Sequence, residues 1–366
     1  MARKTELYAR HEALGGRMID FAGWLLPVQY PTGPIEEHHT VRRAAGLFDI
    51  DHMAQLVVTG PDALAYLQRL VTMDVSRMAM GEAHYSLVCY EDGGIVDDIF
   101  VYRMPDRYFI AINAANADKD TRWFQAQTGG FQVTVRNVAE ETYMLALQGP
   151  KAEDILQPLT PADLRQLGFH RAVDSTVAGV PTLIGRTGYT GEDGFELFFP
   201  REKALLLWDR IMEVGTPHGL KPIGLAARDS LRFEAKMPLY GQEIGPDINP
   251  IQAGLGWAVA FNKGDFIGRN ALLKVRLEGP KTKLVGLEMI DRGVPRHTYP
   301  VVAGDRIVGE VTTGMFAPTV GRYLALAYVP VELAALGTEV GVQIRNEVKR
   351  AKVVETPFYV PAYRRK

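Results

Sequence analysis

Residues 54–71 read AQLVVTGPDALAYLQRLV, and residues 143–160 read YMLALQGPKAEDILQPLT. Each stretch begins with an apolar segment typical of a β-strand, continues through Gly-Pro and ends with apolar residues at helical spacing. The spacing is clearest at Leu64, Leu67 and Leu70 of the first copy. Because the pattern occurs twice rather than in a longer series, it predicts two related α+β subdomains instead of a solenoid.

Strand and helix signals also alternate in the rest of the first 240 residues. Apolar segments at 95–103 and 107–112 flank a Met-Pro-Asp turn, which predicts a β-hairpin, and a helix is expected to start near Asn113. We expect further helices over residues 35–45, 201–214 and 224–235. This mixture of strands and helices predicts an α+β fold.

The sequence from residue 283 to residue 358 is rich in strand signals, punctuated by Gly and Pro. This pattern is typical of a small barrel or of a sandwich, and it does not distinguish between the two. Residues 241–282 lie between the two patterns, and we interpret them as a connecting region.

The composition restricts the classes of function. The 366 residues carry a formal net charge of −2, with 47% hydrophobic and 23% charged residues, as in a globular protein of two or three domains. We therefore expect no nucleic-acid partner. No apolar stretch approaches the roughly 20 residues of a membrane span, so we expect no membrane partner. The single cysteine, Cys89, excludes an internal disulfide, and we expect a cytoplasmic protein.

Two neighbouring acids, Asp97 and Asp98, interrupt an apolar strand signal just after two glycines. Consecutive strand residues face opposite sides, so one carboxylate is expected to face solvent and the other an interior cleft. A carboxylate in a cleft can stabilise developing positive charge. A polar pair next to a turn, without a functional role, is an equally good interpretation.

Residues 188–196, GYTGEDGFE, form a glycine-laced turn with one aromatic residue and three acids. Glycine lets the backbone approach a ligand closely, and Tyr189 can stack on a flat heterocycle. Glu196, at the start of the next strand, can accept two hydrogen bonds from an amidine-like edge. The alternative is a hairpin loop whose acids are solvated, and the pattern alone favours that alternative.

Other charged and imidazole groups leave further alternatives. Arg228 and Arg232 are one helical turn apart, so they can grip a carboxylate or form surface ion pairs. Neighbouring residues on a helix point about 100° apart, so His38 and His39 rarely share a metal, and we expect no metal site. His52 is a lone histidine in an apolar segment, which favours a structural role.

Taken together, many segments of the chain resemble the glycine cleavage T-protein family of aminomethyltransferases. They fall in one order from residue 5 to about residue 270, and TTGMFAPTVGRYLALAYVP resembles the family's last domain. The matching segments are TELYARHEALGGRMIDFAGWLLPVQY, GLFDIDHM, GGIVDDIFVYR, ALQGP, GRTGYTGEDGFEL, GLAARDSLRFEAKMPLYGQEI, NPIQAGLGWAV and DFIGR.

The resemblance implies three domains in a cloverleaf-like arrangement around a central cavity for tetrahydrofolate. It assigns a folate-binding α+β domain to residues 1–50 plus 137–240, a ferredoxin-like α+β domain to 51–136, the connecting region to 241–282 and a β-barrel to 283–366. It also implies a reaction in which lipoylated H-protein delivers an aminomethyl group to tetrahydrofolate, giving 5,10-methylenetetrahydrofolate and ammonia.

The resemblance also assigns roles to single residues. Asp98 matches the second acid of the family's G-G-x-x-D-D motif and is expected to be catalytic, because a carboxylate can stabilise a cationic methylene-iminium carbon. Glu196 matches the pterin-binding glutamate. The remaining residues expected to contact folate are Tyr189, Arg228, Asn113 and Tyr363.

The sequence departs from the family pattern at two positions, and other functions of the same fold remain open. Many members have serine where this chain has Asp51, and glycine where it has Lys236; an Asp51 that faced the ligand would put the substrate in doubt. A folate-dependent demethylase would share the folate residues. A folate-binding factor for iron–sulfur assembly would need a cysteine that residues 263–269, KGDFIGR, lack.

Overall fold

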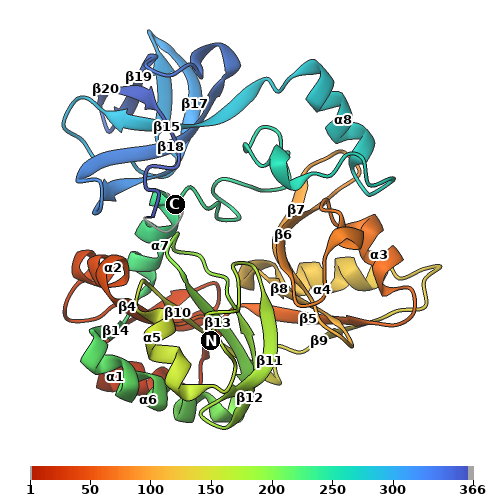
Figure 1. Ribbon diagram of the computed structural model, residues 1–366. Coiled ribbons are helices and arrows are strands. Elements are labelled where there is room, and N and C mark those ends of the chain that lie inside the picture. The colour runs from red at the N-terminus through yellow and green to blue at the C-terminus, as the bar shows by residue number, and fades with distance from the viewer. Residues whose placement is uncertain (1, 362–366) are drawn as a thin grey trace. The chain divides into compact units, whose positions relative to one another are not determined.

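The computed structural model describes residues 2–361 of the chain (Figure 1). The chain divides into two units, each built from several separate segments. Unit 1 comprises Met1–Leu67, Val75–Tyr85 and Ile99–Leu231, and unit 2 comprises Gln68–Asp74, Ser86–Asp98 and Arg232–Lys366. The domain boundaries expected from the sequence stay a prediction.

The centre of unit 1 is a six-stranded sheet with the strand order β11-β12-β13-β10-β4-β14 (Figure 1). All neighbouring strands are antiparallel except β14 and β4, which are parallel. The strands are β4 (Ala45–Asp49), β10 (Thr142–Gln148), β11 (Ala172–Val177), β12 (Val180–Gly185), β13 (Gly194–Pro200) and β14 (Leu220–Pro222).

Alternating side chains give this sheet two buried faces. Along β10, Leu145 and Leu147 point into one core, while Met144 and Ala146 point into the other, as the period of two of a strand requires. Two helices cover the first face, α5 (Ala152–Leu156) and α6 (Ala204–Gly215). The second face packs against residues of two other helices, α2 (Pro34–Arg43) and α7 (Leu225–Glu234).

A five-stranded sheet with the order β6-β7-β8-β5-β9 contains the predicted hairpin. Strand β7 runs antiparallel to β8, with Phe100 opposite Ala111, so the hairpin expected around the Met-Pro-Asp turn is confirmed. The strands are β5 (Ala54–Thr59), β6 (Ala83–Cys89), β7 (Ile95–Arg103), β8 (Tyr108–Ile112) and β9 (Thr134–Asn137). A further sheet of unit 1 contains β1 (Arg3–Lys4), β2 (Arg17–Phe21) and β3 (Trp24–Gln29).

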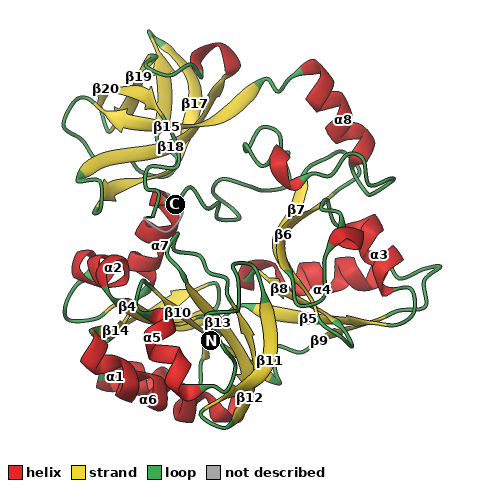
Figure 2. Ribbon diagram, in the orientation of Figure 1, coloured by secondary structure: helices red, strands yellow, loops and turns green. Residues whose placement is uncertain are grey.

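Unit 2 contains a closed six-stranded barrel, which Figure 2 shows as the strand-rich part of the chain. Its strands follow the order β15-β18-β17-β16-β19-β20 and enclose an aliphatic core that includes Leu287, Val311 and Val342. The sequence left barrel and sandwich open, and the strand order decides for the barrel. The strands are β15 (Thr282–Met289), β16 (Pro300–Ala303), β17 (Arg306–Ala317), β18 (Arg322–Pro330), β19 (Glu339–Ile344) and β20 (Glu347–Val354).

The α+β fold class and the C-terminal barrel expected from the sequence are therefore confirmed. Two helices were not expected, α1 (Tyr8–Ala13) and α8 (Arg269–Glu278). Helix α8 lies inside the predicted connecting region; within this helix only Leu272 is buried, and charged residues mask the helical period. The remaining helices are α3 (Ala63–Leu70) and α4 (Ala117–Ala126). Within residues 2–361, none of the helices combines the length and the apolar character that crossing a membrane requires.

Candidate folate-binding site

Three of the residues singled out in the sequence meet in unit 1. The guanidinium of Arg228, on α7, lies 4.7 Å from the centroid of the Tyr189 ring. The charge of Arg228 also acts on the carboxylate of Glu196, which β13 carries. Tyr189 lies in the turn between β12 and β13, so residues from one turn, one strand and one helix form this cluster.

Hydrogen bonds fix one oxygen of Glu196 and leave the other available. Thr187 donates to Oε2 over 2.6 Å, and the Tyr102 hydroxyl donates to the same oxygen over 3.1 Å. Among residues 2–361, Oε1 accepts no hydrogen bond. Burial raises the pKa of the Glu196 carboxyl, while the bond from Thr187 and the charge of Arg228 oppose this increase. The result is a buried, oriented acceptor with one unused oxygen.

The register of the sheet explains why Glu196 points to this side. Glu196 lies opposite Ala146 of β10, and Ala146 lies opposite Phe48 of β4, so the three side chains share one face. The neighbours Phe195 and Leu197 point into the other core. A shift of one residue in this register would bury Phe195 here and turn the carboxylate away.

Hydrogen bonds and ion pairs hold the turn before β13, and its acids are paired with arginines. Arg42 of α2 donates to the carbonyl oxygen of Thr190 over 2.7 Å and pairs with Glu192 over 3.1 Å; the Arg42 and Glu192 side chains are 5% and 6% exposed. Asp193 pairs with Arg186 over 2.6 Å. The interpretation of a loop with solvated acids, which the pattern alone favoured, is therefore wrong for Glu192, because a distant arginine covers it.

Two glycines of the turn are needed for different physical reasons. A Cβ on Gly188 would lie 1.9 Å from the side-chain oxygen of Gln148, so a larger residue at this position would displace the Gln148 amide. Gly191 has a φ of +80°, which side chains other than glycine adopt at a cost. Gln148 in turn donates to the Thr187 carbonyl over 3.0 Å and accepts from Thr190 over 2.9 Å.

The structure separates the two arginines that the helical spacing had grouped. Arg232 is 1% exposed and pairs with Glu243 over 2.7 Å, so it forms neither a surface ion pair nor a clasp with Arg228 on a ligand carboxylate. The hydroxyl groups of Thr312 and Thr313 also donate to Glu243, over 2.7 and 2.5 Å. Arg232 is therefore part of a buried polar network of unit 2.

The other predicted site residues lie apart from this cluster in the sequence. In unit 2, Asp97 is fully buried and Asp98 is half-buried, so neither faces bulk water fully. Asn113, in unit 1, is half-buried and precedes the short 3-10 helix at Ala114–Asn116. Tyr363 lies outside the described residues.

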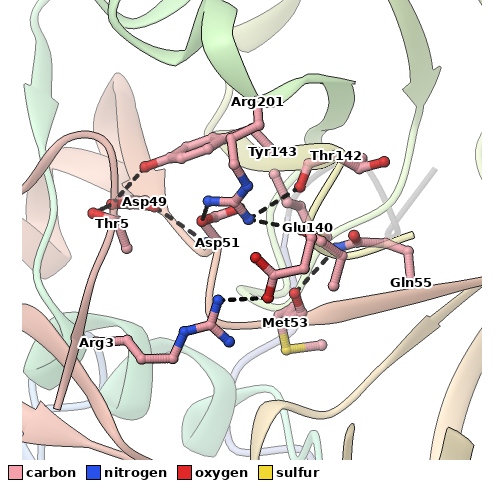
Figure 3. Close-up of polar contacts among 12 residues, drawn as sticks. Arg3, Thr5, Asp49, Asp51, Met53, Gln55, Glu140, Thr142, Tyr143 and Arg201 are labelled. Carbon is pink, nitrogen blue, oxygen red and sulfur yellow. Dashed lines mark hydrogen bonds and ion pairs between the residues drawn. The ribbon is translucent and has the colours of Figure 1, made fainter. Parts of the chain in front are cut away.

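Asp51 does not present an uncompensated charge (Figure 3). Arg201 donates to both of its carboxylate oxygens, over 2.7 and 3.1 Å, and the Asp51 side chain is fully buried. Burial and the neighbouring carboxylate of Asp49 nevertheless raise the pKa of Asp51 to about 8. The departure from serine at this position is thus matched by an arginine that is distant in the sequence.

The second departure has a backbone explanation. Lys236 has a φ of +55°, in the left-handed region that favours glycine, and this backbone conformation fits the glycine of the family pattern expected from the sequence. Lys236 is half-buried, and burial lowers its pKa.

The histidine pair of α2 has an internal role. His38 Nδ1 lies 2.8 Å from the Ser230 hydroxyl, and its ring packs edge-on against His39. No group of three or more potential metal-ligating side chains occurs among residues 2–361.

Sequence reasoning missed the residues that position the carboxylate and the turn. Tyr102 lies among the apolar residues of β7, and nothing in the pattern marks its hydroxyl group. Thr187 directly precedes the glycine-laced turn, which is the one signal that could have singled it out. Arg42 is 150 residues away from its partner Glu192, so spacing along the chain gives no indication of the pair.

Comparison with known proteins places the chain in a family. Residues 7–263 match the family model described as the GCVT N-terminal domain, and residues 282–359 match the glycine cleavage T-protein C-terminal barrel domain. The aminomethyltransferase of Symbiobacterium thermophilum is 53% identical, covering 99% of both chains, and that of Herpetosiphon aurantiacus is 52% identical, covering 99% of this chain and 100% of the relative.

A solved structure agrees with these matches. The crystal structure of the glycine cleavage system aminomethyltransferase T from Bartonella henselae has a TM-score of 0.93 to this chain at 35% identity, covering 99% of both chains. The resemblance found in the sequence is therefore confirmed over nearly the whole chain. The chain belongs to the glycine cleavage T-protein family of aminomethyltransferases.

Proposed function

We propose that this chain transfers the aminomethyl carbon of S-aminomethyldihydrolipoyl H-protein to tetrahydrofolate, as an enzyme of glycine cleavage. The observation that carries the proposal is the Glu196 carboxylate, buried beside Tyr189 and Arg228, with Oε2 held by two hydroxyls and Oε1 unused. A pterin presents a ring N–H and an exocyclic amine side by side. One ionised carboxylate can accept from both.

The turn and α7 supply the remaining contacts of the proposed pterin site. The ring of Tyr189 offers a flat face for stacking, and the Arg228 guanidinium lies against that ring, where it balances the charge of Glu196. Arg42 holds the turn that carries Tyr189 through Thr190 and Glu192. Asn113 and Tyr363 remain predicted folate contacts.

Asp98 is the proposed catalytic residue. The C–S bond of the aminomethyl donor breaks, the electron pair leaves with the lipoyl sulfur, and a methylene-iminium cation remains. Folate N5 attacks this carbon, N10 then displaces ammonia, and the N5 and N10 protons end on the ammonia nitrogen and the sulfur. A fixed carboxylate at position 98 stabilises the cation and orients N10. Alternate strand residues share a face, so Asp98 projects from the face of β7 that carries Tyr102.

The test is a turnover assay with tetrahydrofolate and aminomethyl-loaded H-protein, with ammonia as the readout. We expect Asp98→Asn to lower turnover by about 100-fold or more while the Kd for tetrahydrofolate changes by less than about threefold, because the lost charge acts in the transition state. Glu91→Gln removes an exposed carboxylate from the preceding turn of the sequence and serves as the control.

The assay also separates the competing function of the same fold. Turnover of a methylated sulfonium or amine, with no ammonia from loaded H-protein, would identify a demethylase instead. Full ammonia release by Asp98→Asn would remove the catalytic role from this residue. A cytoplasmic location remains part of the proposal.

A further inference from the structure

His52 is a buried histidine without an internal hydrogen-bond partner. It follows β4 by three residues and is 5% exposed. Its Nδ1 atom is sealed from solvent, and among residues 2–361 neither ring nitrogen has a hydrogen bond. Nε2 is not sealed in the same way, so the remaining exposure of the residue includes this nitrogen.

Two other histidines of unit 1, both fully buried, have hydrogen-bond partners inside the protein. His11 lies 2.9 Å from the Asp49 carboxylate through Nε2 and 2.8 Å from the Tyr30 hydroxyl through Nδ1. His38 Nδ1 lies 2.8 Å from the Ser230 hydroxyl. A buried polar group without a partner costs about 1–3 kcal/mol, so an unsatisfied imidazole needs a physical reason.

His52 lies close enough to Arg228 for the charge of that arginine to act on it, as it does on Glu196. His52 follows Ile50, which packs in the same core as Phe48, and Phe48 shares a row of the sheet with Glu196. Phe21 covers the imidazole edge-on, with ring centroids 5.5 Å apart. The carboxylate of the neighbouring residue, Asp51, accepts from Arg201, and among residues 2–361 it makes no hydrogen bond with the imidazole.

The imidazole is neutral. Burial, reinforced by the charge of Arg228, lowers the pKa of His52 to about 3. A buried N–H without an acceptor is rarer than a buried acceptor without a donor. The favoured neutral tautomer is therefore the one in which the sealed Nδ1 carries no proton. Its proton lies on Nε2, so Nε2–H is a hydrogen-bond donor.

We propose that His52 is a further ligand-binding residue of the pterin site, where its Nε2–H donates to an acceptor on the part of the pterin ring that Glu196 does not contact. This inference rests on the proposed function. The partner missing from the protein is then supplied by tetrahydrofolate.

Two substitutions test the energetic side of the proposal by titration calorimetry of the full-length chain with tetrahydrofolate. His52→Leu removes the donor, and we expect the Kd to rise about tenfold, as for the loss of one hydrogen bond. Glutamine can place an amide N–H near the position of Nε2, so His52→Gln should keep the Kd within about threefold of the wild type. Equal losses in both variants would favour a purely structural role.

Nitrogen NMR of the histidine-labelled wild-type chain tests the contact directly and does not depend on how the variants fold. On addition of tetrahydrofolate, the ring signals of His52 should shift, while those of His11 and His38 should not, because His11 is bonded internally through both ring nitrogens and His38 through Nδ1. Saturable binding with unchanged His52 signals would overturn this inference and leave the proposed function intact. No saturable binding at all would overturn both.

Discussion

Thr187→Val is the sharpest test of how hydrogen bonds orient the Glu196 carboxylate for ligand binding. Valine has nearly the shape of threonine, so the substitution keeps the packing and removes the hydroxyl, which donates to Oε2 over 2.6 Å and lies 2.9 Å from the Tyr102 hydroxyl. Thr187 is 5% exposed, so water cannot easily replace the lost donor. The Tyr102 hydroxyl, at 3.1 Å, then remains as the second donor to this oxygen.

The expected magnitude follows from the geometry. A hydrogen bond to a charged group contributes roughly 1.5–3 kcal/mol, and about 1.4 kcal/mol corresponds to a tenfold change in Kd. Because Thr187 acts on the ligand only through Glu196, we expect the lower end, a Kd for tetrahydrofolate about tenfold higher. The bond from Thr187 also opposes the burial that raises the pKa of Glu196. Loss of this bond raises the pKa of Glu196 further. As the pH is lowered, the variant should therefore become protonated at Glu196, and lose affinity for tetrahydrofolate, at a higher pH than the wild type.

The assay is anaerobic titration calorimetry with tetrahydrofolate from about pH 6 to about pH 8. Thr182→Val is the matched control, because Thr182 is also buried but its hydroxyl donates to the backbone oxygen of Val180 over 2.9 Å. Identical Kd values and identical pH profiles for Thr187→Val and the wild type would refute the reasoning. An equal loss of affinity in Thr182→Val would show that the effect comes from altered packing and not from the hydrogen bond to Glu196.

Two further predictions concern stability. Arg42→Met breaks a buried pair with Glu192, so it should lower the free energy of unfolding by about 3 kcal/mol and speed amide exchange in residues 188–196. The control Arg3→Met removes an exposed pair with Glu140 and should lower the free energy of unfolding by at most about 1 kcal/mol. Equal effects of the two substitutions would contradict the role given to Arg42. The pKa of Asp51 is raised in the folded protein, so Asp51 stabilises the fold fully below about pH 4, near the pKa of an unfolded aspartate. This stabilisation is lost as the pH rises through about 8. The thermal midpoint of the wild type should therefore fall relative to Asp51→Asn between about pH 5 and about pH 9. A constant difference would mean that Arg201 keeps the carboxylate ionised throughout.

Local patterns predicted the elements well where one period dominates. Strand β7 was expected at 95–103 and spans Ile95–Arg103, and the helix expected at 224–235 spans Leu225–Glu234. The second copy of the opening repeat is less regular, because α5 ends at Leu156 and continues as a 3-10 turn over Gln157–Leu159. Pro158 lies in that turn and cannot donate a backbone hydrogen bond.

The sequence by itself determined which residues were candidates. The sequence alone shows a glutamate near the start of an apolar strand, after a glycine-laced turn, and an arginine on a regular helix. Neither observation requires knowledge of the residues that these side chains contact. Hydrophobic periods of two and 3.6 residues assign each side chain to a face, and this depends only on neighbours along the chain. The face that carries Glu196, opposite the row of Phe195 and Leu197, follows from that period.

Only the tertiary structure decided how the charges are paired. Arg228 and Arg232 are one turn apart on α7, yet one lies against Tyr189 and the other is buried on Glu243. Arg201 reaches Asp51 across 150 positions of sequence. The physical reason is that the energy of a buried charge depends on which groups surround it in space, and packing brings those groups from distant parts of the chain.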